Sequence, residues 1–442
     1  MLARGRVRQA VDDRAWLQAM LDVEAGLARA QARASLLPAD HAEAIARACR
    51  ADAFDLAALG RDAASGGNPV IPLVRALVHA VPGPAGAAVH TGATSQDILD
   101  SAAMLVAHRA LGPLLDDLAG AATAAADLAA AHRATALAGR TLLQQALPVT
   151  FGFKAAGWLV ALDEAAARLG EVRRTRLAVQ LGGAVGTLAS LGDAGTEVLT
   201  GLARELGLAE PVLPWHTVRT RVAELAGALG TAAGVAGKVA RDVILLAQTE
   251  VAEVREGGPA GHGGSSTLPH KRNPVAAVAA LASAEQAPGL VATLLAAMLQ
   301  EHERAAGAWH AEWRPLTDLL RATGSAAAWL RDCLEHLEVD AGRMRRNLDL
   351  TGGLLLAERV TTALAPSLGR LDAHELVQRA SAEAVASQRP FAEVLYDQPK
   401  VSDLLDPEEI GRLLDPAGYL GATDELISRA LRAHAERGAK PA

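Results

Sequence analysis

The sequence predicts an all-α protein built around long helices. Half of its 442 residues are hydrophobic but only 3% are aromatic, so the apolar content is mainly Ala, Leu and Val, a mixture that favours helices. Several Ala- and Leu-rich segments are longer than an average globular helix. Almost no stretch alternates apolar and polar residues as a half-buried strand would. The length exceeds a single core and suggests about three domains.

The N-terminal region, 1–111, is expected to form a domain of shorter helices. Turn signals interrupt it at Leu37-Pro38, at 65–69 (Ser-Gly-Gly-Asn-Pro) and at 82–84 (Pro-Gly-Pro). A helical run is expected from Ile98 to Ala110. The region therefore indicates a helical domain that precedes the longer segments.

The central region, 112–350, is expected to be a bundle of long helices. These helices are predicted at 113–134, 148–174, 218–254, 274–301 and 308–337. Such lengths are typical of an extended bundle, in which each helix buries one apolar stripe against its neighbours. The glycine cluster at 182–186 lacks the GxGxxG spacing and follows no β-rich run, so it is interpreted as a turn. Shorter helices return after 351–353, which predicts a small C-terminal helical domain over 351–442.

Bulk properties exclude several classes of function. The formal net charge of −7 and the lack of a basic patch argue against nucleic acid as a partner. The two cysteines, Cys49 and Cys333, lie far apart and imply neither a disulfide framework nor a cysteine metal site. No apolar signal segment opens the chain, and no charge-free stretch reaches the roughly 18 residues of a membrane span. We therefore expect a cytoplasmic protein without a membrane segment.

A polar, glycine-dense loop is expected at 257–274, between two of the longest predicted helices. Five of its first eight residues are glycines, and hydroxyls, a histidine, a lysine and an asparagine follow within nine positions. Helix connections in bundles usually take about two to eight residues, so a longer one suggests a lid or binding loop. Asn273 and Pro274 match an N-cap followed by an N1 proline, so the next helix would point its positive end at a bound anion. For Asn273 alone, an ordinary cap is the preferred interpretation.

Serine ionises too weakly to act as a base unless its neighbours favour the alkoxide. Lys271, His270 and the loop amides are the groups that would supply such a field to Ser265. Residues 264–274 read GSSTLPHKRNP, which resembles the GSSxMPxKxNP signature of the fumarase/aspartase superfamily, with Leu268 in place of methionine. The resemblance implies that Ser265 is the carbon acid or base, and that Lys271 and Asn273 hold and stabilise a substrate carboxylate.

A second segment, 90–97 (HTGATSQD), precedes the helical run from Ile98. Thr94 with Asp97 matches a capping box, and a helix start with hydroxyls, an amide and free N–H groups also suits a carboxylate. The segment resembles the first shared region of the superfamily, which implies substrate binding by Thr94, Ser95 and Gln96. In the adenylosuccinate lyase branch the histidine at the position of His90 assists catalysis; considered alone, a lone histidine is more often structural.

A third segment, 139–148 (GRTLLQQALP), resembles the second shared region, which implies substrate binding by Thr141 and Gln144. Fumarases and adenylosuccinate lyases carry a proton-transferring histidine where this chain has Leu142. Absence of that histidine is a trait of bacterial 3-carboxy-cis,cis-muconate cycloisomerases, and the resemblance to that branch spans nearly the whole chain. His216 stands at a predicted helix start after Pro214, where substrate contact and a plain N-terminal turn are equally open.

The resemblance implies a three-domain fold in which the long helices of four subunits form a twenty-helix core with shared active sites. It implies a cofactor-independent cyclisation of a small polycarboxylate, and the 301–304 cluster shows no HExxH pattern of a metal site. Two alternatives stay open. One is a lyase of the same superfamily, such as an adenylosuccinate lyase, and the other is a non-catalytic structural paralogue.

Overall fold

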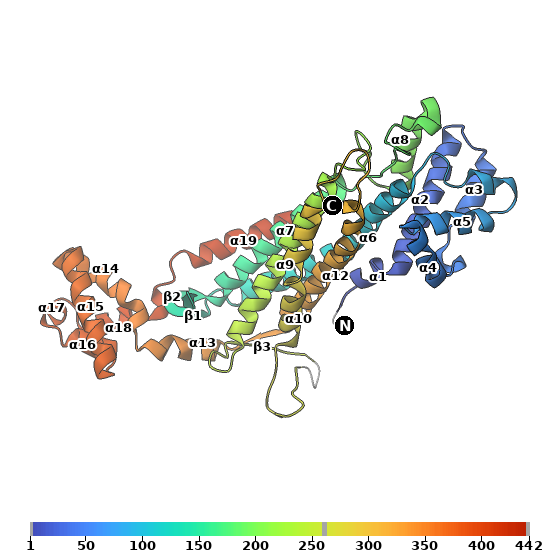
Figure 1. The fold of residues 1–442 in the computed structure, drawn as a ribbon. Coiled ribbons are helices and arrows are strands. Elements are labelled where there is room, and N and C mark those ends of the chain that lie inside the picture. Colours follow the sequence, from blue (N-terminus) through green and yellow to red (C-terminus); the bar gives the residue numbers. More distant parts are fainter. Residues whose placement is uncertain (1–2, 259–262, 439–442) are drawn as a thin grey trace. The chain divides into compact units, whose positions relative to one another are not determined.

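The structure, a computed structural model, describes residues 3–258 and 263–438; residues 259–262 of the predicted loop lie outside this description. The expected helical fold class is confirmed (Figure 1). The helices of the N-terminal region are α1 (Val7–Ala10), α2 (Asp13–Arg33), α3 (Ala39–Ala48), α4 (Leu56–Gly66) and α5 (Val70–Ala80). Four of them have 4 to 11 residues, as expected, whereas α2 has 21. Helices α4 and α5 end near the predicted turns at 65–69 and 82–84, because glycine and proline interrupt the backbone there.

The long helices differ from the prediction at two prolines. The helices from Ser95 to Glu335 are α6 (Ser95–Ala131), α7 (Phe151–Thr175), α8 (Gly195–Leu206), α9 (Thr220–Leu246), α10 (Val275–Ala284), α11 (Ala287–Ala296) and α12 (Ala308–Glu335). Helix α6 continues through Pro113, where a break was predicted, because the neighbouring Leu111 and Leu114 are fully buried and packing outweighs one lost backbone bond. The predicted helix 274–301 is instead split, with Pro288 in the first turn of α11.

Two short antiparallel sheets were not predicted. Strands β1 (Ala136–Thr141) and β2 (Gln144–Thr150) form a hairpin in which Thr141 pairs with Gln144. The helix expected from Pro148 therefore begins only at Phe151. Strands β3 (Val254–Glu256) and β4 (Leu337–Val339) form the second sheet. Strands of three to seven residues are too short for an alternating pattern to stand out in the sequence.

The chain divides into two compact units, each built from three stretches of sequence. The first contains residues up to Ala119, Glu164–Lys238 and Val278–Arg331, and the second contains Gly120–Asp163, Val239–Ala277 and Asp332 onward. Within the first unit, α2 packs on α3 and α8. The three-domain boundaries 1–111, 112–350 and 351–442 stay a prediction.

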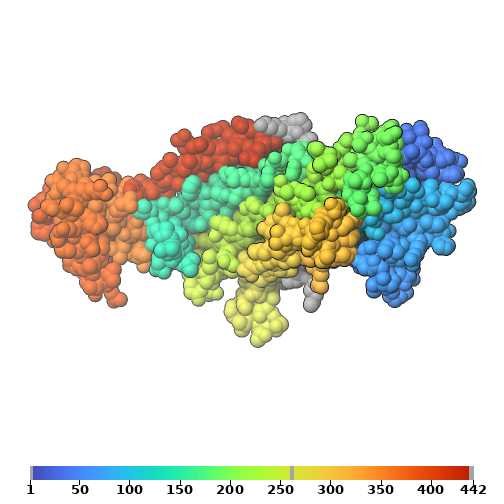
Figure 2. Space-filling model, turned by 45° about the horizontal axis from the view of Figure 1, so that its top comes forward, coloured from blue at the N-terminus to red at the C-terminus, as the bar shows by residue number. Residues whose placement is uncertain are grey.

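The second unit contains the C-terminal helices. These are α13 (Ala341–Leu348), α14 (Ala357–Leu368), α15 (Arg370–Ser387), α16 (Phe391–Tyr396), α17 (Pro399–Ser402), α18 (Pro407–Leu413) and α19 (Thr423–Gly438). Helices α14 to α18 gather into one cluster, seen in orange in Figure 2, around the buried Phe391, Val394 and Leu395. Helix α13 packs on β1 and so supports the hairpin.

Among the residues that the structure describes, two helical stretches have the length and apolarity of a membrane span. They are 95–131 and 275–296, with mean hydropathies of 1.3 and 1.4. The first has 67% of its apolar window buried inside the protein, as expected of a core helix, and the second has 39%. The second stretch therefore leaves much apolar surface uncovered by the described residues.

Candidate active site

In the first unit, a tight turn carries His90 to the start of α6. His90 and Gly92 both have left-handed backbones, with φ of 63° and 78°. A Cβ on Gly92 would lie 2.4 Å from Leu191 Cδ2, so only glycine fits there. A left-handed non-glycine residue such as His90 is uncommon, and such strain often marks functional sites. The turn presents Thr94 and Ser95, both half-buried, at the first turn of the helix.

The ring of His90 is held by a buried carboxylate. Its Nδ1 lies 2.7 Å from Glu24 Oε1, and the side chains of His90 and Glu24 are 19% and 1% exposed. Burial by itself lowers the pKa of His90, but the hydrogen bond and charge of Glu24 outweigh it and raise that pKa. No local pattern in the sequence indicated this partner, because Glu24 lies 66 residues away.

Asp97 organises the start of α6. Its Oδ2 accepts hydrogen bonds from the amides of Thr94 (3.0 Å) and Gly183 (2.9 Å), and its Oδ1 accepts one from the amide of Gly182 (3.0 Å). The Thr94 bond is the Asp97 half of the predicted capping box. The glycine cluster is a turn, as expected, and its amides bind a carboxylate of the chain itself.

His216 completes the set of groups on Asp97. Its Nε2 lies 2.7 Å from Asp97 Oδ1, and its side chain is 4% exposed. Gln96 is equally buried: its amide donates to Asp100 Oδ2 (3.1 Å) and to the carbonyl of His216 (2.8 Å). Gln96 was predicted to contact substrate and His216 was a secondary candidate for such contact. In the structure both are buried and hydrogen-bonded to other residues of the protein at the start of α6.

A buried ion network lies below this scaffold. Arg219 binds Asp100 through two nitrogens, at 2.7 and 2.9 Å, and binds Glu312 at 2.6 Å. Trp309 donates to the same Asp100 (3.0 Å). Burial raises the pKa of Glu312, although the charge of Arg219 opposes this. Three buried charges with several hydrogen bonds each fix the position of α6 relative to α12 within this unit.

Arg304 is a further candidate that the sequence did not single out. Its guanidinium donates to Gln96 Oε1 (3.2 Å) and to the carbonyls of Gly183 (2.7 Å) and Ala184 (3.1 Å). All three are neutral acceptors, and no carboxylate of the described residues forms an ion pair with Arg304. Among the described residues Arg304 is a half-buried cation without an anionic partner, hydrogen-bonded to Gln96 in the first turn of α6, and such a cation suits a carboxylate ligand. The sequence showed only a charged turn at 301–304.

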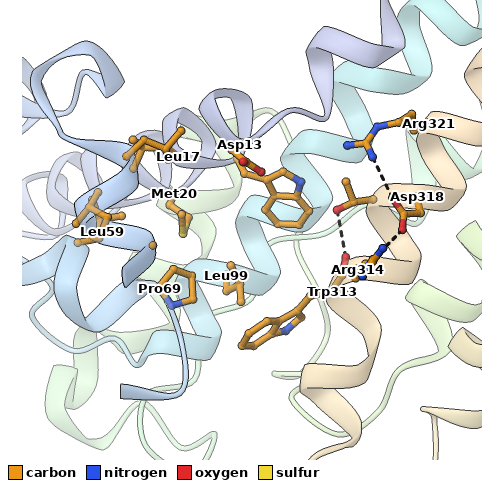
Figure 3. A pocket seen from close by; sticks show the side chains of 15 residues that line it. Asp13, Leu17, Met20, Leu59, Pro69, Leu99, Trp313, Arg314, Asp318 and Arg321 are labelled. Carbon is orange, nitrogen blue, oxygen red and sulfur yellow. Dashed lines mark hydrogen bonds and ion pairs between the residues drawn. The ribbon is translucent and has the colours of Figure 1, made fainter. Parts of the chain in front are cut away.

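An apolar cavity of the same unit is lined by none of the predicted site residues. It has a volume of about 570 Å³ and is walled by Leu17, Leu59, Leu99 and Trp313, with arginine and aspartate side chains at one side (Figure 3). Two arginines there, Arg314 and Arg321, already pair with Asp318. An apolar wall cannot replace the hydration of a polycarboxylate, so we do not place the catalytic site in this cavity.

In the second unit, the β1–β2 hairpin presents Thr141 and Gln144, both exposed. Between them lie Leu142 and Leu143, which are 97% and 74% exposed. Both leucines have left-handed backbones, with φ of 49° and 65°. The residues predicted to bind substrate thus flank an exposed, strained apolar tip without a titratable group.

The hairpin is fixed by a buried carboxylate at its base. Arg140 binds Glu253 through two nitrogens, at 2.9 and 2.7 Å, and Asn347 donates to the same carboxylate at 2.8 Å. Glu253 is fully buried. Because Glu253 directly precedes β3, this contact ties the hairpin to the strand from which the 257–274 loop departs.

The signature loop holds Ser265 by its own backbone. The Oγ of Ser265 accepts hydrogen bonds from the amides of Thr267 (3.2 Å) and Leu268 (3.1 Å). Asn273 closes the loop, since its backbone and side-chain nitrogens donate to the carbonyl of Gly263 at 2.7 and 3.1 Å. Gly263 has a φ of 67°, and a Cβ there would lie 2.3 Å from the Asn273 carbonyl oxygen, so glycine is required.

The predicted anion site at the start of α10 is occupied by the chain itself. Glu256 accepts hydrogen bonds from the amides of Ala276 (2.9 Å) and Ala277 (2.7 Å). The expectation that this helix start faces a substrate anion is therefore wrong for these amides. Glu256 lies directly before the loop, and the sequence did not mark it as the cap of a helix that begins after the loop. Lys271 is exposed and stays available for a ligand.

Comparisons with known proteins identify the family of the chain. The profile of the family described as Lyase matches residues 3–289, and that of the adenylosuccinate lyase C-terminus matches 353–430. The chain belongs to this lyase family, as the signature at 264–274 predicts.

Individual relatives match the chain over nearly its whole length. A 3-carboxy-cis,cis-muconate cycloisomerase of Bradyrhizobium diazoefficiens is 50% identical, over 98% of this chain and 96% of its own. A nitrosuccinate lyase of Streptomyces davaonensis is 47% identical, over 96% of this chain and 92% of its own. A crystal structure of the 3-carboxy-cis,cis-muconate lactonizing enzyme from Pseudomonas putida has a TM-score of 0.92 at 47% identity, and covers 98% of this chain and 97% of its own.

Proposed function

We propose that this protein is a cycloisomerase that converts 3-carboxy-cis,cis-muconate to 4-carboxymuconolactone. The likeness to a cycloisomerase of that name over nearly the full length supports the substrate. The observation that carries the reaction type is Leu142. It stands at the hairpin tip where fumarases and adenylosuccinate lyases carry a histidine, and it can neither give nor accept a proton. An internal addition needs no second group to protonate a leaving atom.

In the proposed reaction, one carboxylate of the substrate adds to a double bond and negative charge builds up on another as an enediolate. A carbon then takes a proton, so a tricarboxylate becomes a lactone dicarboxylate and one proton is taken up from solvent. Ser265 is proposed to deliver the proton to carbon. The two amides on its Oγ stabilise the alkoxide that remains, until solvent restores the proton. Lys271 and Asn273 are proposed to stabilise the enediolate.

The substrate's other carboxylates are assigned to the two remaining segments. Thr94 and Ser95 offer hydroxyls at the start of α6, and Arg304 offers a guanidinium without an anionic partner among the described residues. Thr141 and Gln144 would act from the hairpin. We propose that Gln96 and His216 act through the scaffold, since both are buried and already hydrogen-bonded.

We also propose that the protein acts as a cytoplasmic homotetramer with active sites shared between subunits. The apolar surface of the 275–299 stretch supports this: Val278, Leu295 and Leu299 are 49%, 47% and 83% exposed. Side chains of this kind are normally covered by a partner. No cofactor is needed by the proposed chemistry, and a small polycarboxylate is the only partner besides other copies of the chain.

The function is tested with the purified protein and 3-carboxy-cis,cis-muconate. Closure of the ring removes the conjugated diene, so the ultraviolet absorbance should fall and the lactone should accumulate. Parallel reactions contain nitrosuccinate, read as released nitrite, and adenylosuccinate, read as released AMP. Turnover of either of these without bleaching of the muconate would contradict the proposal, and no turnover of any would favour a structural paralogue.

The role of Ser265 is tested by a matched pair of variants, Ser265→Ala and Ser266→Ala. Each removes one hydroxyl from the same loop. We expect the first to lose turnover by about a thousandfold or more and the second to keep most of it, as losing a positioned proton donor costs about 10² to 10⁴ in rate. Equal losses in both variants would reject Ser265 as the proton carrier.

A further inference from the structure

The pair formed by His90 and Glu24 has the geometry of a carboxylate–imidazole dyad. Glu24 comes from the middle of α2, is 1% exposed, and contacts Nδ1 of His90 at 2.7 Å. A carboxylate accepts only, so Nδ1 must carry a hydrogen. The second oxygen, Oε2, is buried and has no protein donor among the described residues. The full negative charge of Glu24 is thus directed at one imidazole.

The other ring nitrogen of His90 is left open. None of the described residues hydrogen-bonds Nε2, and 19% of the side chain is exposed. The charged groups that face the ring are Glu24 from α2 and Asp97 from α6, both acidic. Burial lowers the pKa of His90, and these two carboxylates more than reverse that effect.

We infer that Glu24 is a positioning residue that keeps His90 in its charged form, with Nε2–H presented as a donor for one carboxylate of the substrate. This inference rests on the proposed function for the identity of the ligand. The left-handed backbone of His90, anchored by the Gly92 turn, directs the ring onto Glu24 instead of leaving it in solvent. Strain of this kind persists only where the surrounding contacts impose it.

His216 forms a similar pair with Asp97 but is suited to a different task. Its side chain is 4% exposed, and its carboxylate partner also accepts from the amides of Thr94, Gly182 and Gly183. The charge of Asp97 is therefore shared among several donors, whereas that of Glu24 is not. Of the two histidines, we therefore assign the contact with substrate to His90 and a structural role to His216.

The test is the variant Glu24→Gln, which removes the negative charge of Glu24 and keeps the shape of its side chain. The imidazole of His90 is followed by NMR on histidine-labelled protein, with the signal assigned from a His90→Gln variant. Without the carboxylate, burial is the dominant effect, so the titration of His90 should move to lower pH. This measurement needs no substrate, so it stands even if the proposed function fails.

Kinetics then test the ligand. His90 is charged below its pKa, so KM for the muconate should rise as the pH rises through that value. In Glu24→Gln this rise should begin at lower pH, and near neutral pH KM should be about tenfold or more above that of the wild type, as expected for loss of a hydrogen bond to a charged group. Glu24→Asp, which keeps the charge, should return the profile part of the way.

A matched control is provided by Gln31 on the same helix. Its amide donates to the carbonyl of Thr91 (2.6 Å), so it anchors the same turn without contacting the imidazole. Gln31→Leu should leave the His90 titration and the pH at which KM rises unchanged. The same displacement in Gln31→Leu and Glu24→Gln would overturn the inference, and so would an unchanged His90 titration in Glu24→Gln.

Discussion

Replacing Asp97 by asparagine removes a negative charge without changing the size of the side chain. Four donors meet this carboxylate: the amides of Gly182 and Gly183 at 3.0 and 2.9 Å, the amide of Thr94 at 3.0 Å and Nε2 of His216 at 2.7 Å. Each oxygen accepts two of them. Asparagine has one acceptor oxygen, so in either orientation two buried donors lose their acceptor and face an NH₂ group.

An unsatisfied buried donor costs about 1 to 3 kcal/mol, so Asp97→Asn should destabilise the protein by about 2 to 6 kcal/mol. The measurement is the midpoint of thermal unfolding at matched protein concentration, because assembly would otherwise shift it. Asp116→Asn is the control, since that carboxylate is 59% exposed in a surface pair with Arg6 and contributes little. If both variants unfold at the same temperature, the four bonds do not hold the start of α6 as described.

Two further predictions concern substrate binding and assembly. Arg304→Ala should raise KM about tenfold or more with a smaller effect on kcat, and Arg304→Lys should recover part of the loss because it keeps the charge; an unchanged KM in steady-state kinetics would remove Arg304 from the binding site. Mixing Ser265→Ala subunits with His90→Ala subunits under exchange should restore activity above that of either variant alone, and no recovery would count against shared active sites.

Local patterns in the sequence predicted the local structure well. The turn at 182–186, the Asp97 half of the capping box at Thr94 and the helical fold class all depend on residues close together in the chain, and each is found in the structure. Where packing competes with a local signal, the prediction failed. Pro113 marks a break by its missing N–H, yet α6 continues through it because the surrounding side chains are buried.

Contacts between distant segments could not be predicted from one sequence. Glu24 lies 66 residues from His90, and Arg304 lies 208 residues from Gln96. Glu256 accepts hydrogen bonds from the first amides of α10 although it lies 20 residues away, so the sequence predicted Asn273 as the cap instead. In the sequence, Glu24, Arg304 and Glu256 look like ordinary solvated surface charges. Their roles can be recognised only when the fold shows which residue each one contacts.

The strained tip of the β1–β2 hairpin bears on how this family changes its chemistry. Leu142 and Leu143 adopt a left-handed backbone that branched and bulky apolar residues disfavour, whereas histidine is among the residues enriched there. A histidine at position 142 could adopt the existing backbone conformation without added strain. Because the side chain of Leu142 is 97% exposed, the replacement would disturb almost no packing. A single replacement at the hairpin tip would therefore convert an inert side chain into one that can exchange protons. The core would not need to repack.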